Sequence, residues 1–240
     1  MNVYLVRHAQ AGTREAYDSL SELGKQQSRL LGEHLLSQGI RFQTAYAGTL
    51  VRQQETLEQL RQAYVHVGVS LPAVCADPGW NEFDLGRVYR EIAPQLSAED
   101  PQFRREYEDM LEQIQISQGA HAAGIHRKWQ PCDTKIVNAW ICGRYRYGGE
   151  TWGQFQRRVE ACRLKMRDGK RDENILVVTS AMPIAIWTGL SLEISDQRLM
   201  RLAGVLYNAS YTIVRLREAQ PRLFTFNAAP HLPAEMRTHR

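Results

Sequence analysis

The strongest constraint on the fold is a set of short apolar runs in which polar and apolar residues do not alternate. The clearest run lies in ENILVVTS, Glu173–Ser180, where four consecutive apolar residues precede Thr179. A strand whose successive side chains are all apolar is covered on both faces, which is typical of a parallel sheet flanked by helices. The segment AMPIAIWTGL follows at once, and Pro183 falls in the first turn of the helix that it predicts.

The same succession of strand and helix signals recurs along the chain. Further strands are predicted at Val3–Val6, Phe42–Ala47, Ala73–Ala76, Tyr211–Leu216 and Arg222–Phe226, the last two as a pair near one edge. Helices are predicted to begin after N-capping residues at Ser21, Thr49 and Thr151. We therefore expect a three-layer α/β/α fold, with a mostly parallel sheet and helices on both of its faces.

The length of 240 residues allows a single domain over 1–240 that carries an insertion at about 89–147. Within the insertion, Ala98–Ser117 shows an acidic helical pattern, whereas Gly119–Gly149 has little periodicity and is predicted to be an irregular, lid-like segment. This segment holds five Lys and Arg residues against one Asp, a net charge of +4 that would attract anions. The patch is too small and too poor in ordered aromatic spacing to indicate nucleic acid.

Hydropathy and cysteine usage favour a cytoplasmic protein. The longest nearly apolar run, Ile175–Leu190, is interrupted by polar residues and a proline, so no membrane span is predicted. The first strand signal begins at Asn2 and leaves no room for a cleaved leader. The four cysteines have no C-x-x-C spacing, which fits reduced thiols.

Polar residues that could bind an anion or take part in catalysis follow the predicted strands. Arg7 and His8 end the first strand, at the edge where open α/β sheets bind ligands, and could form an anion site that contains a nucleophile. Arg52 lies near the start of the helix after the second strand, where anions are favoured. Glu82 and Asp84 lie in the loop after the third strand, where a carboxylate could protonate a leaving group. Taken separately, each residue also fits an ordinary solvated side chain.

Taken together and in their order, these motifs resemble the histidine phosphatases, a family that includes the cofactor-dependent phosphoglycerate mutases. The resemblance rests on YLVRHAQ, LSELGKQQSRLLGEHL, AYAGTLVRQQET, NEFDLG, GGETW and ILVVTSAMPI. It covers both ends of the chain and leaves out a stretch from about Tyr89 to Tyr147.

The resemblance implies a phosphohydrolase that acts on a small phosphomonoester through a phosphohistidine at His8. Arg7 and Arg52 would hold the phosphate oxygens, and Glu82 would protonate the leaving oxygen and then help to activate water. The expected partner is a small anionic phosphorylated substrate, and the chemistry requires no metal or organic cofactor. Neutral imidazole is a good nucleophile near pH 7, and phosphoryl transfer depends mainly on positioning and on cationic groups.

One position departs from the family pattern. The family has a second histidine that contacts the transferring phosphate, and this chain has Ser180 in its place. A hydroxyl can donate to a phosphate oxygen but brings no positive charge, so activity is expected to be attenuated, by roughly 100- to 1,000-fold. His121 and His126 of the insertion could supply an imidazole if that segment folds over the pocket.

Two other functions stay open. A catalytically inactive sensor or interaction module that binds a phosphorylated ligand is favoured by Ser180, whereas a glycolytic mutase is disfavoured because AQAGTREAYDS lacks the Trp-Asn of such mutases. A zinc site would need ligands whose spacing matches no standard pattern, namely His121, His126, Cys132 and Cys142. Charge alone names neither the substrate nor the oligomeric state.

Overall fold

The computed structural model describes residues 1–12, 18–116, 126–166, 172–217 and 220–239, without the side chains of 113–116 and 126–131. The chain divides into two compact units. Unit 1 comprises residues 1–82 and 158–240, and unit 2 comprises residues 83–157. The insertion predicted at about 89–147 falls within unit 2.

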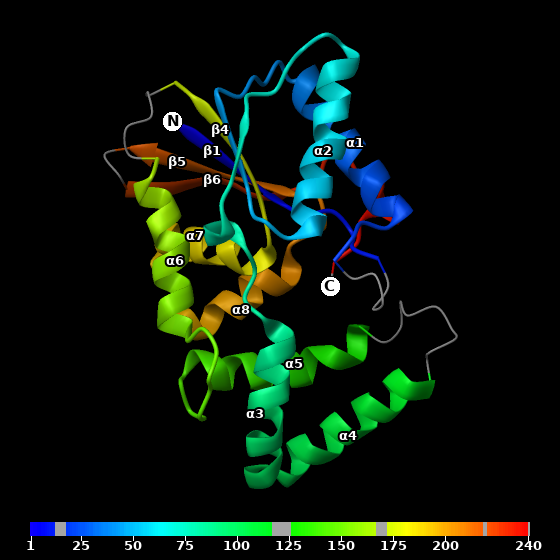
Figure 1. Cartoon of the computed structure of the whole chain (residues 1–240), viewed down its shortest axis with the longest axis vertical. Helices are drawn as coiled ribbons and strands as arrows, with labels where there is room; N and C mark the ends of the chain where they lie inside the picture. Colours follow the sequence, from blue (N-terminus) through cyan, green and yellow to red (C-terminus); the bar gives the residue numbers. More distant parts are fainter. Residues whose placement is uncertain (13–17, 117–125, 167–171, 218–219, 240) are drawn as a thin grey trace. The chain divides into compact units, whose positions relative to one another are not determined.

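Unit 1 is built on a six-stranded sheet with the strand order β3-β2-β4-β1-β5-β6 (Figure 1). The strands are β1 (Asn2–Arg7), β2 (Thr44–Ala47), β3 (Val74–Ala76), β4 (Asn174–Thr179), β5 (Tyr211–Arg217) and β6 (Gln220–Ala228). Strands β3, β2, β4 and β1 run parallel, whereas β5 is antiparallel to β1 and to β6. The predicted mostly parallel sheet and the predicted edge pair are confirmed.

The register of the parallel strands aligns their carboxyl ends. Arg7 of β1 lies opposite Thr179 of β4, and Ala47 of β2 lies opposite Val178 of β4. The segments that follow β1, β2 and β4 therefore leave the sheet next to one another, at the edge where parallel sheets bind ligands.

Helices cover both faces of this sheet and confirm the predicted three layers (Figure 1). Helices α1 (Glu22–Ser37) and α2 (Val51–His66) pack against each other and share a core with Val6, Leu176 and Val178 of the sheet. Helix α7 (Ala181–Leu192) packs on the other face, and α8 (Asp196–Val205) packs against α7. Helix α6 (Trp152–Leu164) runs from unit 2 into unit 1, and short 3-10 turns lie at Pro78–Trp80 and Ala234–Met236.

Two of the predicted N-caps are present. Ser21 Oγ accepts a hydrogen bond from Gly24 N at 3.0 Å at the start of α1. Thr151 Oγ1 accepts from Gln154 N at 3.4 Å, while Gln154 Oε1 accepts from Thr151 N at 2.8 Å. This reciprocal arrangement is a capping box, which satisfies N–H groups that the first turn of α6 leaves without helical partners.

Unit 2 is helical, and one sequence prediction for it is wrong. Its helices are α3 (Leu85–Glu99), α4 (Pro101–Ile116) and α5 (His126–Ile141). Residues 126–141, within the segment predicted to be irregular, form α5. Ile136 and Trp140 are buried four residues apart on this helix, which is a helical spacing. Pro131 lacks an N–H and is a helix-breaking signal in the sequence, yet the helix continues through it.

Aromatic rings and a cap organise the core of unit 2. Phe83 stacks on Trp140 with ring centroids 4.6 Å apart, and Trp152 meets Trp140 edge-on at 5.4 Å. Asp84 Oδ1 accepts from Arg87 N at 2.8 Å and caps α3, which gives this carboxylate a structural role.

Among the helices of the described residues, none is both long and apolar enough to cross a bilayer.

The close approach of α1 to the loop after β1 predicts opposite outcomes for two glycine substitutions. A Cβ at Gly24 would collide with the backbone oxygen of Gln10, whereas a Cβ at Gly204 in α8 would have no heavy atom within 4 Å. We expect Gly24→Ala to lower the free energy of unfolding by about 1–3 kcal/mol. Gly204→Ala should raise it by about 0.5–1 kcal/mol. Urea unfolding of both variants checks the prediction, and a stabilised Gly24→Ala would contradict it.

Candidate active site

His8 is buried at the end of β1, and its two ring nitrogens have different hydrogen-bond partners. Its backbone N donates to Thr179 O at 2.8 Å, and its ring Nδ1 lies 2.9 Å from Ala9 O. Because a carbonyl oxygen only accepts, these contacts place the ring proton on Nδ1 and the lone pair on Nε2. Arg52 Nε donates to this Nε2 at 3.3 Å. The ring nitrogen with nucleophilic capacity therefore faces a guanidinium group.

The backbone around His8 is fixed by two side chains from other elements. Ala9 N donates to Thr56 Oγ1 at 3.0 Å, and the same hydroxyl donates to Arg52 O at 2.7 Å. Asn208 Nδ2 donates to His8 O at 3.2 Å. Thr56 thus links the residue after His8 to the helix turn that carries Arg52.

Two buried guanidinium groups make this edge of the sheet cationic. Arg7 is 5% exposed and donates through Nη1 to Leu206 O. Arg52 is 8% exposed and forms an ion pair with Asp18, with 3.0 Å between Nη1 and Oδ1. Asp18 itself is about half exposed, so it compensates only part of this charge. Buried arginines with hydrogen-bonding capacity are well suited to bind phosphate oxygens.

Glu82 and Ser180 meet at the start of α7. Glu82 Oε2 accepts from Met182 N at 3.1 Å, and Ser180 occupies the N-cap position of the helix. The first N–H groups of a helix have no helical partner, and the carboxyl oxygen of Glu82 satisfies one of them in either protonation state. The proton-transfer candidate is therefore anchored to the segment that follows β4.

The loop that carries Glu82 is anchored by one arginine of α6. Arg158 Nη1 donates to three carbonyl groups of the loop, at 2.9 Å to Pro78 O, 3.0 Å to Gly79 O and 3.2 Å to Asn81 O. Multiple bonds from one guanidinium group fix the path of a loop that has no regular secondary structure at Glu82.

The buried carboxylate of Asp77 stabilises the start of the same loop. Burial acts to raise the pKa of Asp77, but hydrogen bonds from Lys165 and from Gly79 N outweigh it and leave the pKa lowered. Asp77 Oδ1 accepts from Gly79 N at 2.8 Å, and its Oδ2 pairs with Lys165. Burial raises the pKa of the neighbouring Cys162 thiol to about 12, so that group stays protonated. A side chain at Gly79 would collide with Cys162 Sγ, which explains the glycine.

The prediction that Thr49 caps the second helix is wrong. Leu50 occupies the N-cap position of α2. Thr49 N donates to Asn81 Oδ1 at 2.7 Å, and Asn81 Nδ2 donates to Thr49 Oγ1 at 2.8 Å. The threonine hydroxyl is used by this long-range pair, which joins the start of α2 near Arg52 to the loop of Glu82.

Sequence reasoning missed Gln53, whose side chain connects α2 to the start of α7. Gln53 follows Arg52 in α2, is fully buried, and donates through Nε2 to the fully buried Ser180 Oγ at 2.9 Å. The burial of Gln53 could have been predicted from the sequence, because Gln53 precedes the buried Leu57 and Leu60 by four and seven residues. That spacing puts a polar side chain on the buried face of the helix, where it requires partners.

Five predicted site residues lie in unit 1: Arg7, His8, Arg52, Glu82 and Ser180. Only His8 and Arg52 contact each other in the hydrogen bonds described above, and the other three are connected through neighbouring groups. The contacts run from His8 to Arg52, from Gln53 to Ser180, and from Glu82 to the start of α7. His121 lies outside the described residues, and His126 begins α5 with a side chain that is not described. The lid contribution of these histidines and the zinc alternative therefore stay predictions.

The role of Thr56 predicts a contrast between two Thr→Val substitutions. Thr56→Val removes both hydrogen bonds of the hydroxyl and should lower the free energy of unfolding by about 1–3 kcal/mol. Thr188 is equally buried in α7, and its Oγ1 has no hydrogen-bond partner among the described residues. Thr188→Val should therefore be neutral or stabilising. Denaturant unfolding gives both values, and equal losses would contradict the contrast.

Curated relatives share sequence with part of this chain. The serine/threonine-protein phosphatase Pgam5, mitochondrial, of Caenorhabditis elegans is 23% identical over 155 residues, which cover 63% of this chain and 52% of the relative. The corresponding protein of Caenorhabditis briggsae is 22% identical over 156 residues, with 63% and 53% covered. The match thus spans about half the length of these relatives.

Solved structures share the fold over nearly the whole chain. YhfR of Bacillus stearothermophilus superposes with a TM-score of 0.63 at 17% identity, covering 96% of this chain and 98% of that one. A mycobacterial glucosyl-3-phosphoglycerate phosphatase solved with inorganic phosphate gives a TM-score of 0.61 at 18% identity, with 97% and 99% covered. The sequence profile of the histidine phosphatase superfamily (branch 1) matches residues 3–141 and 130–229. The chain belongs to this superfamily.

Proposed function

We propose that the chain is a phosphohydrolase that cleaves a small phosphomonoester through a phosphohistidine at His8. The observation that carries the proposal is the geometry of the His8 ring. Nδ1 donates to Ala9 O, so Nε2 carries the lone pair of the ring, and this nitrogen accepts a hydrogen bond from Arg52 Nε at 3.3 Å. Burial keeps this nucleophile in an environment where the electrostatic effect of Arg7 and Arg52 on bound phosphate is strong.

In the first step, His8 Nε2 attacks phosphorus and the bond from phosphorus to the ester oxygen breaks. The Arg52 contact with Nε2 gives way to the phosphoryl group, and Arg7 and Arg52 donate to its oxygens. Glu82, in its protonated form, gives a proton to the leaving oxygen, so an alcohol departs. The phosphoryl group remains on the imidazole.

In the second step, water attacks phosphorus while Glu82, now a carboxylate, accepts a proton from the water. The bond between Nε2 and phosphorus breaks, and neutral His8 is restored with its proton still on Nδ1. The products are the alcohol and inorganic phosphate. One carboxylate serves both steps because the second needs a base after the first has used an acid.

The proposed substrate class rests on the charge of the site, and the relatives divide between two substrate classes. Two buried arginines and one neutral imidazole favour a dianionic phosphomonoester of small size. The mycobacterial phosphatase of the same fold is named for a phosphorylated sugar-acid substrate, and the nematode relatives are named serine/threonine-protein phosphatases. We assign the small-molecule class to this chain.

A second candidate is a phosphate-binding module without turnover, favoured by the neutral Ser180 at the position where the family has a second imidazole. The two candidates share the binding site and differ in covalent chemistry. A native chain that binds inorganic phosphate but neither forms phosphohistidine nor releases alcohol would identify the binding module.

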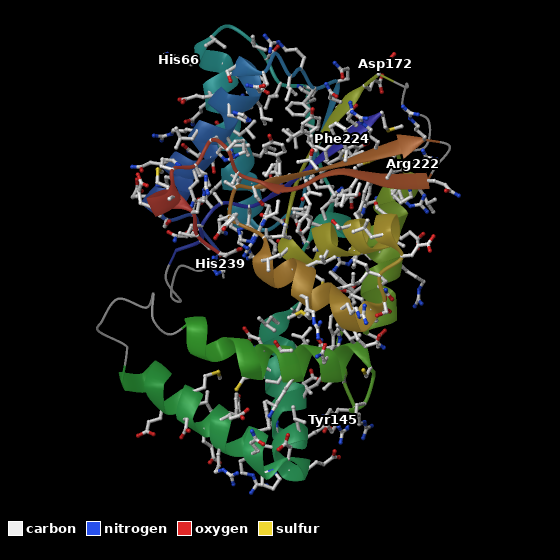
Figure 2. The ribbon with its side chains drawn as sticks, turned by 180° about the vertical axis from the view of Figure 1, so that it is seen from behind. His66, Tyr145, Asp172, Arg222, Phe224 and His239 are labelled. Carbon is white, nitrogen blue, oxygen red and sulfur yellow. The ribbon has the colours of Figure 1, made fainter. Side chains whose placement is uncertain are left out.

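The proposal predicts an acid-labile, base-stable phosphate on His8. Incubation with an aryl phosphate in the presence of a chelator, quenched in alkali, should give phosphohistidine in the native chain and in His66→Ala. His66 is exposed at the end of α2 and serves as the matched control (Figure 2). His8→Ala should form none, and its turnover should fall to background. Phosphohistidine that persists in His8→Ala would overturn the assignment.

The role of Glu82 predicts a dependence on the leaving group. Glu82→Gln should slow the hydrolysis of an alkyl phosphate by about 100-fold or more, because its alkoxide needs a proton as the bond breaks. Hydrolysis of a nitrophenyl phosphate should slow much less, since nitrophenolate leaves without protonation. Steady-state rates on the two substrates give the comparison, and equal losses on both would exclude Glu82 as the acid.

A further inference from the structure

Gln53 is a buried primary amide whose orientation is settled by its neighbours. Its Nε2 lies 3.1 Å from Trp80 O and 2.9 Å from Ser180 Oγ, and its Oε1 accepts from Leu50 N at 3.2 Å. The Trp80 carbonyl can only accept and Leu50 N can only donate, so the reverse orientation would lose both bonds. The amide therefore donates to Ser180.

This donation determines what the Ser180 hydroxyl can do. A hydroxyl that accepts one hydrogen bond still has its own proton to donate. With one lone pair of Oγ occupied by Gln53, that proton is directed to another acceptor. Ser180 stands at the N-cap of α7, two residues before Met182, whose N–H holds Glu82. An oxygen of an anion bound at this helix start is the acceptor that fits the position.

Close packing keeps the amide in this place. Gln53 and Ser180 are both 0% exposed. The Gly48 backbone lies against the amide, because a Cβ on Gly48 would collide with Gln53 Oε1 and would lie 2.6 Å from Asn81 Oδ1. The Gln53 side chain therefore has no space to move toward Gly48. A larger side chain at position 180 would consequently meet the Gln53 amide.

We propose that Gln53 is a positioning residue that fixes the Ser180 hydroxyl as a neutral hydrogen-bond donor to a phosphoryl oxygen. The inference rests on the proposed phosphate site. The pair fills the space and supplies the hydrogen bond of a second imidazole, without its charge. An imidazole changes charge between pH 5 and 8, whereas an amide and an aliphatic hydroxyl do not.

The first test measures binding of inorganic phosphate to the full chain by calorimetry. Gln53→Met and Ser180→Ala should each weaken binding about tenfold, and the double variant should lose no more than either one, because both act through one donor. Gln54→Met is the matched control, since Gln54 donates to Gly48 O. Its phosphate affinity should stay unchanged. Additive losses, or native affinity in Gln53→Met, would overturn the proposal.

The second test exchanges the pair for an imidazole. Ser180→His alone should bind phosphate no better than the native chain, because Gln53 occupies the space. Ser180→His combined with Gln53→Ala should bind more tightly, and its affinity should fall more steeply as the pH rises through about 6.5 than that of Gln53→Ala, in which only the titration of phosphate itself is shared. Thermal unfolding checks that each variant folds, and a single variant too unstable to fold agrees with the collision. A single variant that equals the double one would contradict it.

Phosphate binding separates this inference from the proposed reaction. A native chain that binds phosphate without forming phosphohistidine would overturn the enzyme and leave the pair intact. Independent effects of Gln53 and Ser180, with phosphohistidine still formed, would overturn the pair alone. A native chain that binds no phosphate would overturn both.

Discussion

The parallel pairing of β4 with β1 on one side and with β2 on the other is the constraint on which the site depends. This pairing sets the carboxyl ends of three strands at one edge, and the chain continues from them into His8, into α2 and into α7. Residues far apart in sequence thereby converge on strand ends and first helix turns, except Glu82, whose loop is held by Arg158. A site carried by strand ends and first helix turns is held more rigidly than one carried by loops, because ladder and helix bonds fix its backbone.

Placing charged groups in this edge is costly unless each has partners, and the structure supplies them from several elements. Arg52 has Asp18 and the His8 ring, Arg7 has a backbone carbonyl, and Glu82 has the N-terminus of α7. These partners are backbone groups or partly exposed side chains. They hold the charges in position, with the guanidinium groups of Arg7 and Arg52 as the hydrogen-bond donors that suit a phosphate dianion.

Ser180 has a hydrogen-bond partner, Gln53, that the sequence motif around it does not reveal. Ser180 is fully buried, and the equally buried Gln53 donates a hydrogen bond to its hydroxyl. The two positions are 127 residues apart in sequence and belong to helices on opposite faces of the sheet. A neutral, hydrogen-bonded pair therefore links the first turn of α2 to the start of α7.

The sequence by itself determined the class of fold: non-alternating apolar runs predicted the parallel sheet. Arg7 and His8 at the end of the first strand, together with Arg52 near the start of the helix after the second strand, predicted the anion site. Local signals suffice there, because strand burial and helix starts are written in consecutive residues. Only the tertiary structure decided that Thr49 pairs with Asn81, that Arg158 holds the Glu82 loop, and that Gln53 faces Ser180. It also decided that residues 126–141 form a helix despite Pro131. Hydrogen bonds between distant residues leave no periodic trace, since a polar side chain fits solvent or a buried partner equally well until packing selects one.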